Sequence, residues 1–368
     1  MKSLSSIDVH YLVQELKSLE GSRVDNIYQK GEEFLIQMHK SGDGKKLLKI
    51  IVGKSLFLAS LKDEMESLSG FCMLLRKYLG NAVLASLSQI EPERIVRLEF
   101  DSKAEKAILY LEFFGKGNVI LCKEGDIILD ALTHHEFKDR KVEPKALYSW
   151  PKMGYNAYSM EQGYLSSLLS STTRESLVKC IAIDLGFGGI YAEEACARAS
   201  IDKGTKSSEL SPDQARDLLL AIKGMTEGKA NPVIYLREDK VIDVFPFPLQ
   251  TLSGTDMKPF GTLSEALEHY ALNVSTEKKT SYDAKLEEVS RIIESQRKNI
   301  AELEQEESEN REKAEAIYSN YAKIAAILNE LKEISRKHSW QDIKAKLKDH
   351  PLIKEVNPKE KSVVLELP

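Results

Sequence analysis

The sequence predicts an α+β protein in which a β-rich N-terminal domain with two helices precedes a small helical module and a long helical arm. Short alternating apolar runs, separated by turn residues, fill residues 24–132. Helical patterns joined by glycines follow at residues 160–228, and residues 281–337 contain no Gly or Pro. Because the strands follow one another without helices between them, a doubly wound parallel sheet is excluded.

The chain opens with a predicted helix, since Leu12, Leu16 and Leu19 form one apolar stripe. Ser5 precedes the acid Asp8 by three residues, which is the spacing of a capping box at a helix N-terminus. The runs that follow alternate between apolar and polar residues and are separated by glycines that favour turns. They predict an antiparallel meander with strands at residues 24–29, 34–39, 47–52 and 56–60.

A second helix is predicted over residues 70–79, where Phe71, Leu75 and Leu79 share the apolar face. Further strands are predicted after it, because alternating runs resume with turn residues or charges between them, at residues 83–90, 94–100, 107–114, 118–122 and 127–132. Residues 1–158 are therefore predicted to form one β-rich domain with two helices.

The next two segments change in character. Residues 159–229 predict a small helical domain with short helices at residues 165–169, 176–185, 192–199 and 211–223. Residues 230–275 predict a strand pair followed by a helix. The pattern leaves open whether this last piece packs on the N-terminal domain.

The C-terminal part predicts an extended arm. Residues 276–338 are predicted to form the first helix of a coiled coil, because Leu286, Ile293 and Ile300 lie on a broken heptad-like seam, and residues 339–368 a small tip segment. Such a seam needs a partner, so we expect a truncated chain whose returning helix lies beyond residue 368. In this chain the seam should either form a homodimer through residues 281–337 or fray.

Composition limits the functional classes. The 368 residues carry a formal net charge of −5 with 30% charged residues, so any nucleic-acid contact must be local and not a bulk basic surface. The four cysteines are far apart and form no C-x-x-C pair, which excludes a zinc finger and a disulfide scaffold. No apolar run approaches the roughly 20 residues of a membrane span. We expect a soluble cytoplasmic protein with no metal and no cofactor.

The most distinctive short motif is the run at residues 111–121, which predicts a strand, a tight turn and a second strand with Lys116 at the tip. Gly115-x-Gly117 lacks the third glycine of a dinucleotide loop, and a strand follows it where such a loop opens a helix. Two interpretations remain: a plain hairpin turn, or a turn whose tip touches phosphate.

Two further positions carry charges that could serve a site. Glu93 and Arg94 stand at the entry of a predicted strand, where neighbouring side chains point to opposite faces unless the turn still bends the chain. Arg94 could bind phosphate or stack on a base. The alternative is an ordinary polar strand entry. Asp8 could also serve a site. The alternative is that it is an ordinary acid in the first turn of a helix, where the helix dipole favours a negative charge.

A glycine-rich turn opens a predicted helix at residues 186–199, with Gly186, Gly188 and Gly189 before the helix. Glycines at a helix N-terminus let backbone N–H groups approach a phosphate, as in helix–hairpin–helix modules that hold nucleic-acid backbones. The alternative is simple packing of two helices. No arrangement of nucleophile and base emerges, so we expect no catalytic residues and a protein that is not an enzyme.

Several of these motifs, taken in order, resemble the NFACT family, whose members include fibronectin-binding protein A-like proteins and ribosome quality-control factors. The resemblance extends through residues 185–199 into the long coil and rests on residues 5–9, 21–28, 74–79, 93–95 and 113–121.

The resemblance implies a ribosome-associated quality-control factor. Such proteins bind a large ribosomal subunit obstructed by peptidyl-tRNA and recruit tRNA, often alanyl-tRNA, so that the stalled chain gains a C-terminal tail. The family's acid in the first helix and its acid–Arg pair map to Asp8 and to Glu93 and Arg94. Many relatives have Asp where this chain has Glu93. Lys116 is a weaker candidate for tRNA contact.

The N-terminal and helical domains also resemble formamidopyrimidine-DNA glycosylases. Their chemistry uses an N-terminal Pro amine followed by Glu, but this chain begins Met1-Lys2, and Gly189 stands where those enzymes place an Asn that touches DNA phosphate. A shared scaffold without the catalytic groups implies binding without base excision. A glycosylase-like DNA-binding protein and an adhesin for extracellular matrix remain the alternatives.

Overall fold

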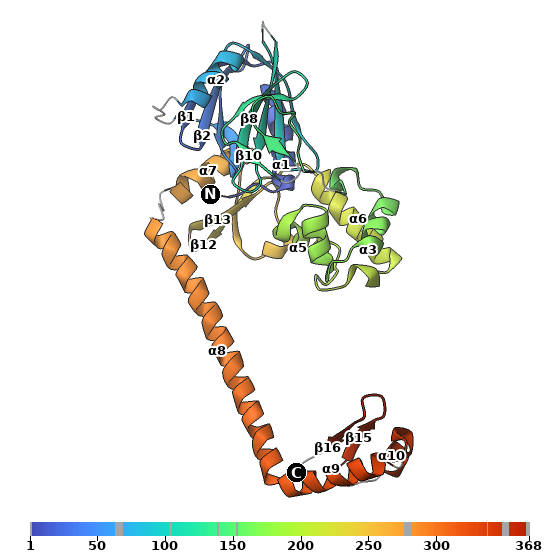
Figure 1. Ribbon diagram of the computed structural model, residues 1–368. Coiled ribbons are helices and arrows are strands. Elements are labelled where there is room, and N and C mark those ends of the chain that lie inside the picture. Colours follow the sequence, from blue (N-terminus) through green and yellow to red (C-terminus); the bar gives the residue numbers. More distant parts are fainter. Residues whose placement is uncertain are drawn as a thin grey trace. The chain divides into compact units, whose positions relative to one another are not determined.

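The computed structural model describes residues 2–62, 69–102, 105–137, 140–151, 154–275, 281–336, 338–347 and 353–365. The chain forms two compact units, Met1–Lys278 and Lys279–Pro368, which are described separately. As expected from the sequence, the first unit is an α+β structure built on a large antiparallel sheet (Figure 1).

The sheet of the first unit has nine antiparallel strands in the order β4-β3-β2-β1-β5-β6-β7-β8-β9. Strands that are consecutive in the sequence pair with each other, with one exception: β4 and β5 do not pair, and β5 pairs with β1 instead. The strands are β1 (Arg23–Lys30), β2 (Glu33–Lys40), β3 (Gly44–Ile51), β4 (Ser55–Ala59), β5 (Val83–Gln89), β6 (Ile95–Asp101), β7 (Lys106–Glu112), β8 (Asn118–Lys123) and β9 (Ile127–Ala131). A short pair, β10 (His135–Glu136) and β11 (Lys141–Val142), follows them.

The two halves of this sheet approach each other at the β3–β4 and β7–β8 turns. Gly53 and Gly117 both have positive φ, +68° and +76°, and a Cβ atom on Gly117 would lie 2.2 Å from the Cα of Gly53. Only glycine permits this approach, because any side chain would meet the opposite backbone. Gly117 of the 111–121 motif therefore lets the two hairpins approach each other, which favours the hairpin interpretation.

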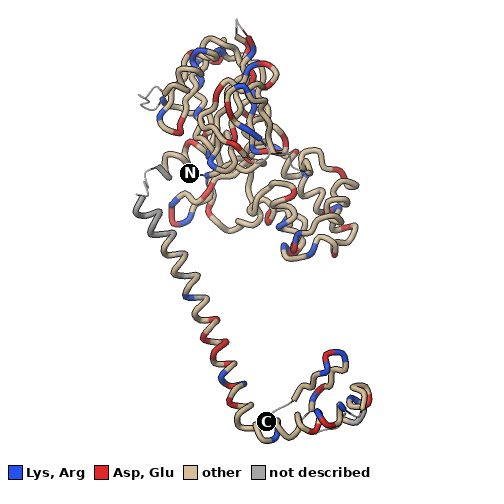
Figure 2. Tube along the Cα trace, in the orientation of Figure 1, with Lys and Arg blue, Asp and Glu red and all other residues tan. Residues whose placement is uncertain are grey.

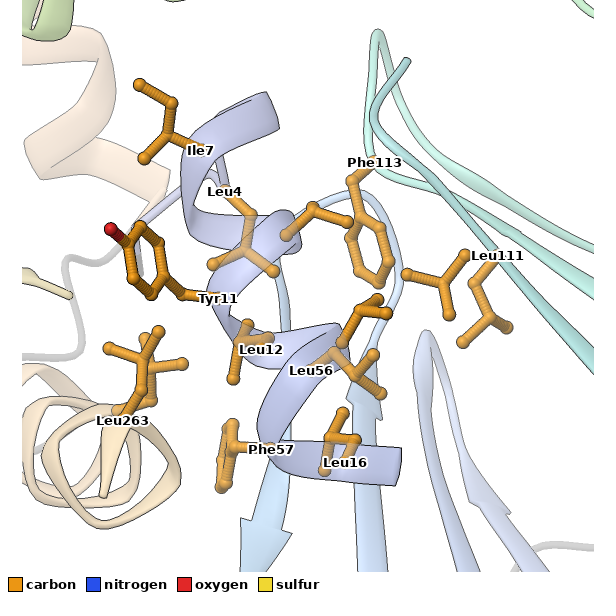
Figure 3. Close-up of a cluster of buried hydrophobic side chains, with 14 of the residues drawn as sticks. Leu4, Ile7, Tyr11, Leu12, Leu16, Leu56, Phe57, Leu111, Phe113 and Leu263 are labelled. Carbon is orange, nitrogen blue, oxygen red and sulfur yellow. The ribbon is translucent and has the colours of Figure 1, made fainter. Parts of the chain in front are cut away.

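Helix α1 (Ser6–Leu16) is buried within this unit. Its capping box joins Ser5 and Asp8 as the sequence predicted. In Figure 3 its apolar side chains lie between Phe113 beside β7, Phe57 of β4 and Leu263 of a later helix. A helix that is apolar on most sides packs in the interior of a fold. Helix α2 (Gly70–Leu79), with residue bounds as predicted, packs on β1.

Residues 154–228 form a helical module. The predicted helices are present, but the second is divided into a short α-helical turn and a π-helix. The elements are η2 (Ala157–Ser159), α3 (Gln162–Ser171), α4 (Leu177–Lys179), η3 (Cys180–Asp184), α5 (Gly188–Arg198), η4 (Ser207–Glu209) and α6 (Pro212–Thr226). The Tyr11 hydroxyl of α1 donates to the Met225 carbonyl of α6 at 3.1 Å, so this module is tied to the interior helix.

Residues 230–275 pack on the N-terminal strands, which the sequence had left open. The α7 helix (Leu263–Ser275) is capped by the Glu15 carboxylate of α1, which accepts from the Leu263 N–H at 2.8 Å. The Ser264 hydroxyl accepts from Leu58 N–H of edge strand β4 at 3.0 Å. A small sheet precedes α7, with β12 (Val233–Arg237) between β13 (Lys240–Phe245) and β14 (Asp256–Pro259). The sequence missed β14, because its residues are all exposed and show no apolar alternation.

The second unit contains α8 (Ser281–Ser319), α9 (Tyr321–Ser335), α10 (Trp340–Lys346) and a hairpin of β15 (Ile353–Asn357) and β16 (Ser362–Leu365). The expectation of one continuous helix over residues 281–337 was wrong, since the helix breaks at Asn320. The reason is a small core in which side chains of α9 pack with Ile343 of α10 and Ile353 of β15. Along α8, the seam residues whose exposure is described, such as Ile300, are exposed.

None of the helices in the described ranges is long and apolar enough to cross a lipid bilayer.

The close approach at Gly117 generates a stability prediction. Gly117→Ala should lower the free energy of unfolding by roughly 2 to 5 kcal/mol, because the substitution adds both left-handed backbone strain and a clash with Gly53. Gly115→Ala is the matched control, since Gly115 also has a positive φ, +59°, but an added Cβ meets nothing within 4 Å. It should cost only about 1 to 2 kcal/mol. Urea unfolding followed by circular dichroism measures both, and equal losses would contradict the close-approach explanation.

Candidate functional site

Two adjoining clefts lie where the first turn of α1, the turn before β6 and the start of α5 meet. Their volumes are about 330 and 310 Å³. The first also reaches β13 and α7, and the second also reaches Phe114. Both clefts are lined by Ser5, Arg94, Phe187 and Gly188. Residues that are far apart in the sequence of the first unit therefore line one continuous site.

The turn before β6 is held by the first turn of α1. The Ser6 hydroxyl donates to the Pro92 carbonyl at 2.6 Å, and the Gln89 side-chain amide donates to the Glu93 carbonyl at 2.9 Å. The chain is still bending at Glu93 and Arg94, because β6 begins only at Ile95. Glu93 and Arg94 both line the second cleft. The sequence allowed them to share a site only if the chain still bends at these two residues, and the structure has that bend.

The Arg94 side chain is half-buried and lines both clefts. Within the described ranges its guanidinium makes no hydrogen bond and no ion pair within 4.0 Å. Burial lowers the pKa of Arg94, and the neighbouring Glu93 carboxylate opposes that shift. Arginine stays protonated in proteins, so a desolvated guanidinium without a bonded acid can bind an anion that enters the cleft.

The N-terminus of α5 faces the same clefts. Gly186 and Gly188 have positive φ, +70° and +75°, and this backbone turns the chain into the helix. The N-cap residue Phe187 makes no side-chain capping bond. The first N–H groups of an α-helix have no partner within the helix, and among the described residues no side chain caps those of α5. An added Cβ on Gly188 or Gly189 would meet nothing within 4 Å, so the backbone is open to a ligand.

Asp8 lines the first cleft but is almost fully buried. Its side chain is only 2% exposed, and both carboxylate oxygens accept hydrogen bonds. Oδ2 accepts from the Ser5 N–H at 2.8 Å, and Oδ1 accepts from the Tyr191 hydroxyl at 2.6 Å and from Lys2 Nζ at 3.2 Å. The capping box that the sequence predicted is therefore present. The direct tRNA contact that the resemblance implied for Asp8 does not fit this enclosed position.

The structure does not bring Lys116 to the site. This residue is exposed at the β7–β8 turn, and its backbone carbonyl lies against Gly53. Neither cleft is lined by Lys116. All the other candidate residues, from Asp8 through Glu93 and Arg94 to the three glycines, line one or both of the clefts. The sequence could not separate Lys116 from them, because the distance between the turns depends on how the sheet folds.

Sequence reasoning missed Lys2, Tyr191 and Asp243. The Lys2 ammonium donates to the Val244 carbonyl, lies 3.7 Å from Asp243 Oδ1 and is 4.0 Å from the centre of the Phe245 ring. Burial is the main cause that raises the pKa of Asp243, and the Lys2 charge opposes it. One signal was available, since Asp243 is an acid inside an otherwise apolar strand pattern.

The described part of the chain offers no cluster of His, Cys, Asp or Glu that could hold a metal ion. Burial raises the pKa of the Cys122 thiol to about 12 and that of Cys196 to about 11. These thiols stay protonated at neutral pH and are poor nucleophiles. The chemistry that the clefts support is binding of an anion with adjacent apolar surface.

Three relatives show what this chain is similar to. The archaeal Rqc2 homolog aRqcH of Methanocaldococcus jannaschii is 29% identical over 378 residues, which cover 96% of this chain and 56% of that protein. The Rqc2 homolog RqcH of Streptococcus pneumoniae is 25% identical over 83% of this chain and 54% of that protein. Ribosome quality control complex subunit 2 of Saccharomyces cerevisiae is 35% identical over 34% of this chain and 12% of that protein. The chain spans about half the length of the first two relatives.

Two solved structures share the fold. The fibrinogen-binding protein of Staphylococcus aureus superposes with a TM-score of 0.61 at 18% identity, over 72% of this chain and 98% of that chain. The N-terminal part of the fibronectin/fibrinogen-binding protein of Streptococcus suis gives a TM-score of 0.60 at 21% identity, over 73% and 99%. At these identities the similarity concerns the fold alone.

The family assignment rests on nearly the whole length of the chain. A family model described as the NFACT N-terminal and middle domains matches residues 5–361. This stretch includes the first turn of α1, the turn before β6, the glycine turn before α5 and the helices of the second unit. The chain therefore belongs to the NFACT family, of which it carries the N-terminal and middle domains.

Proposed function

We propose that this chain acts in ribosome-associated quality control. In this proposal it binds an obstructed large ribosomal subunit with peptidyl-tRNA, binds a tRNA, and supports C-terminal tailing of the stalled nascent chain. Its membership of the NFACT family and the names of its curated relatives, which are ribosome quality-control factors, support this function. Alanyl-tRNA is the tRNA that the family resemblance suggests.

The observation that carries the proposal is that Arg94 and the open N-terminus of α5 face one pair of clefts. A guanidinium and the backbone N–H groups of a helix N-terminus both commonly donate to a nucleic-acid phosphate. The Glu93 carboxylate at the same cleft can accept from a base or ribose hydroxyl but repels phosphate. The site therefore fits a single backbone phosphate with an adjoining nucleoside.

This arrangement explains how an acidic chain can bind RNA. Figure 2 shows blue and red positions interspersed over the described part of the first unit. A net charge of −5 gives little general attraction to a polyanion. Affinity must then come from a few local contacts, and Arg94 is placed to make one of them.

We also infer that α4 to α6 act as a helix–hairpin–helix module and that α8 belongs to a coiled coil. The glycine turn at the start of α5 supports the first inference. The exposed apolar residues of α8, such as Ile293 and Ile300, support the second, because such residues need a partner. That partner is a returning helix of a longer protein or a second copy of this chain.

The two alternative functions have less support. A matrix-binding role rests on the names of two solved structures that share only the fold. A glycosylase needs a free N-terminal Pro amine, whereas the second residue here is Lys2, whose ammonium is engaged by Asp8 and the Val244 carbonyl. The matrix-binding role gives no reason why Arg94 and the start of α5 line the same clefts.

Ribosome binding is tested by sedimentation. The chain should co-sediment with purified large subunits that carry peptidyl-tRNA and should do so less with vacant large subunits, because the tRNA supplies part of the binding surface. The comparison of the two kinds of subunit is the control. If the chain stays in the supernatant with obstructed subunits, the ribosome proposal fails for this part of the protein.

A substitution at Arg94 tests the tRNA contact. Arg94→Ala should weaken tRNA binding by about tenfold or more, because a charge-assisted hydrogen bond is lost. It should also flatten the plot of log affinity against log salt by about 1 unit, since one phosphate contact is removed. Arg23→Ala is the matched control, because Arg23 is an exposed arginine at the start of β1. Filter binding over a range of KCl concentrations measures both. Unchanged affinity and slope in a folded Arg94→Ala protein would remove Arg94 from the site.

The glycine turn gives a separate prediction. Gly189→Ala should weaken tRNA binding and change the free energy of unfolding by less than about 1 kcal/mol, since Gly189 has an ordinary φ and open space around it. The added methyl group would stand between the ligand and the N–H groups of α5. Gly163→Ala is the matched control, because Gly163 is likewise the second residue of a helix with nothing within 4 Å. Equal tRNA affinity of the two variants would show that the ligand does not approach this backbone.

A further inference from the structure

The Asp8 carboxylate is enclosed by three donors, two from the N-terminal residues before α1 and one from α5. Ser5 binds one oxygen, while Tyr191 and Lys2 bind the other. With 2% of its surface exposed, this carboxylate has little room to accept from a ligand. Asp8 lines the first cleft together with Arg94, Gly188 and Gly189.

Tyr191 connects Asp8 to α5. It belongs to the first turn of that helix, it is 2% exposed, and its ring packs edge-on against Phe245 and Phe247 with centroids 5.9 Å away. Burial, followed by the charge of Asp8, raises the pKa of the Tyr191 hydroxyl well above its ordinary value. The phenol therefore remains a proton donor, and its bond of 2.6 Å to Asp8 fixes the N-terminus of α5 relative to α1.

Lys2 connects the same carboxylate to β13. Its side chain is 8% exposed and its ammonium contacts Asp8, the Val244 carbonyl and the Phe245 ring. A buried carboxylate without a nearby cation would be costly, and the Lys2 ammonium supplies that cation at 3.2 Å. Ser6, two residues before Asp8, holds the turn that carries Arg94.

We propose that Asp8 is a positioning residue that does not touch tRNA. Together with Tyr191 and Lys2 it locks the start of α5 against α1, so that the open N–H groups and Arg94 face the same phosphate. This inference rests on the proposed tRNA-binding site. It assigns a physical role to the family's acid in the first helix and adds Tyr191 and Lys2 as residues that the role requires.

The direction in which Asp8→Asn changes tRNA affinity distinguishes a positioning role from a purely electrostatic one. Asp8→Asn removes a negative charge close to the proposed phosphate, so electrostatics alone would strengthen tRNA binding. Positioning predicts the reverse, because the amide offers only one acceptor oxygen to three donors and the start of α5 is released. We expect Asp8→Asn to weaken tRNA binding by about 3- to 30-fold, the range of coupling through a packed network.

The experiment compares Asp8→Asn, Tyr191→Phe and the double variant in tRNA filter binding over a range of KCl concentrations. Tyr191→Phe keeps the ring and removes only the donor to Asp8, so it tests the idea even if Asp8→Asn fails to fold. Each single variant should weaken binding and flatten the salt slope, and the double variant should be little worse than either. Tyr164→Phe, which removes an exposed phenol of α3, is the matched control and should bind normally.

Two results would overturn the inference. The first is tighter or unchanged binding by folded Asp8→Asn. The second is independence of the two residues. Asp8→Asn would then lose tRNA affinity while Tyr191→Phe does not, or the two losses of binding free energy would add fully in the double variant. Either outcome would mean that Asp8 acts on the RNA by itself. Failure of the proposed site looks different, since Arg94→Ala would then leave affinity and salt slope unchanged whatever Asp8 does.

Discussion

The buried first turn of α1 is the constraint on which the rest of the first unit depends. This turn carries Ser6 and Asp8 into the interior with 1% and 2% exposure, and buried polar groups must find partners. The Ser6 hydroxyl donates to the Pro92 carbonyl. The Asp8 carboxylate accepts from Tyr191 and Lys2. Farther along the helix, Glu15 caps α7. One helix thereby fixes the sheet, the helical module and the residues around β13 to one another.

The same constraint explains why a site lies at this end of α1. Holding two other elements near a helix N-terminus leaves a junction of three segments that side chains do not fill completely. The two clefts lie at this junction. Arg94 points into it without a bonded acid, and the start of α5 presents backbone N–H groups. Rigid packing beneath the clefts means that a ligand meets donors that are already in place, so little ordering is needed on binding.

The close approach of Gly53 and Gly117 has a different physical origin. It is a requirement of sheet closure, and it acts far along the chain from the glycines that open α5. Gly117 and Gly188 both have positive φ, yet a Cβ on Gly117 would meet another backbone and a Cβ on Gly188 would meet open space. Glycine-rich motifs in one chain can thus serve packing in one place and ligand access in another, and only the surroundings distinguish the two.

The sequence by itself determined the elements and much of the candidate site. Apolar periodicity located the strands of the large sheet and the limits of α2, and the three-residue spacing of Ser5 and Asp8 located the capping box of α1. These features depend on neighbours a few residues apart. It also singled out Asp8, Arg94 and the glycines before α5 as unusual. It could not show which of these residues meet, because Asp8 and Tyr191 are separated by 183 positions. Only the tertiary structure decided that Asp8 is enclosed, that Lys116 lies elsewhere and that the arm breaks at Asn320, since each depends on contacts between segments that local pattern does not encode.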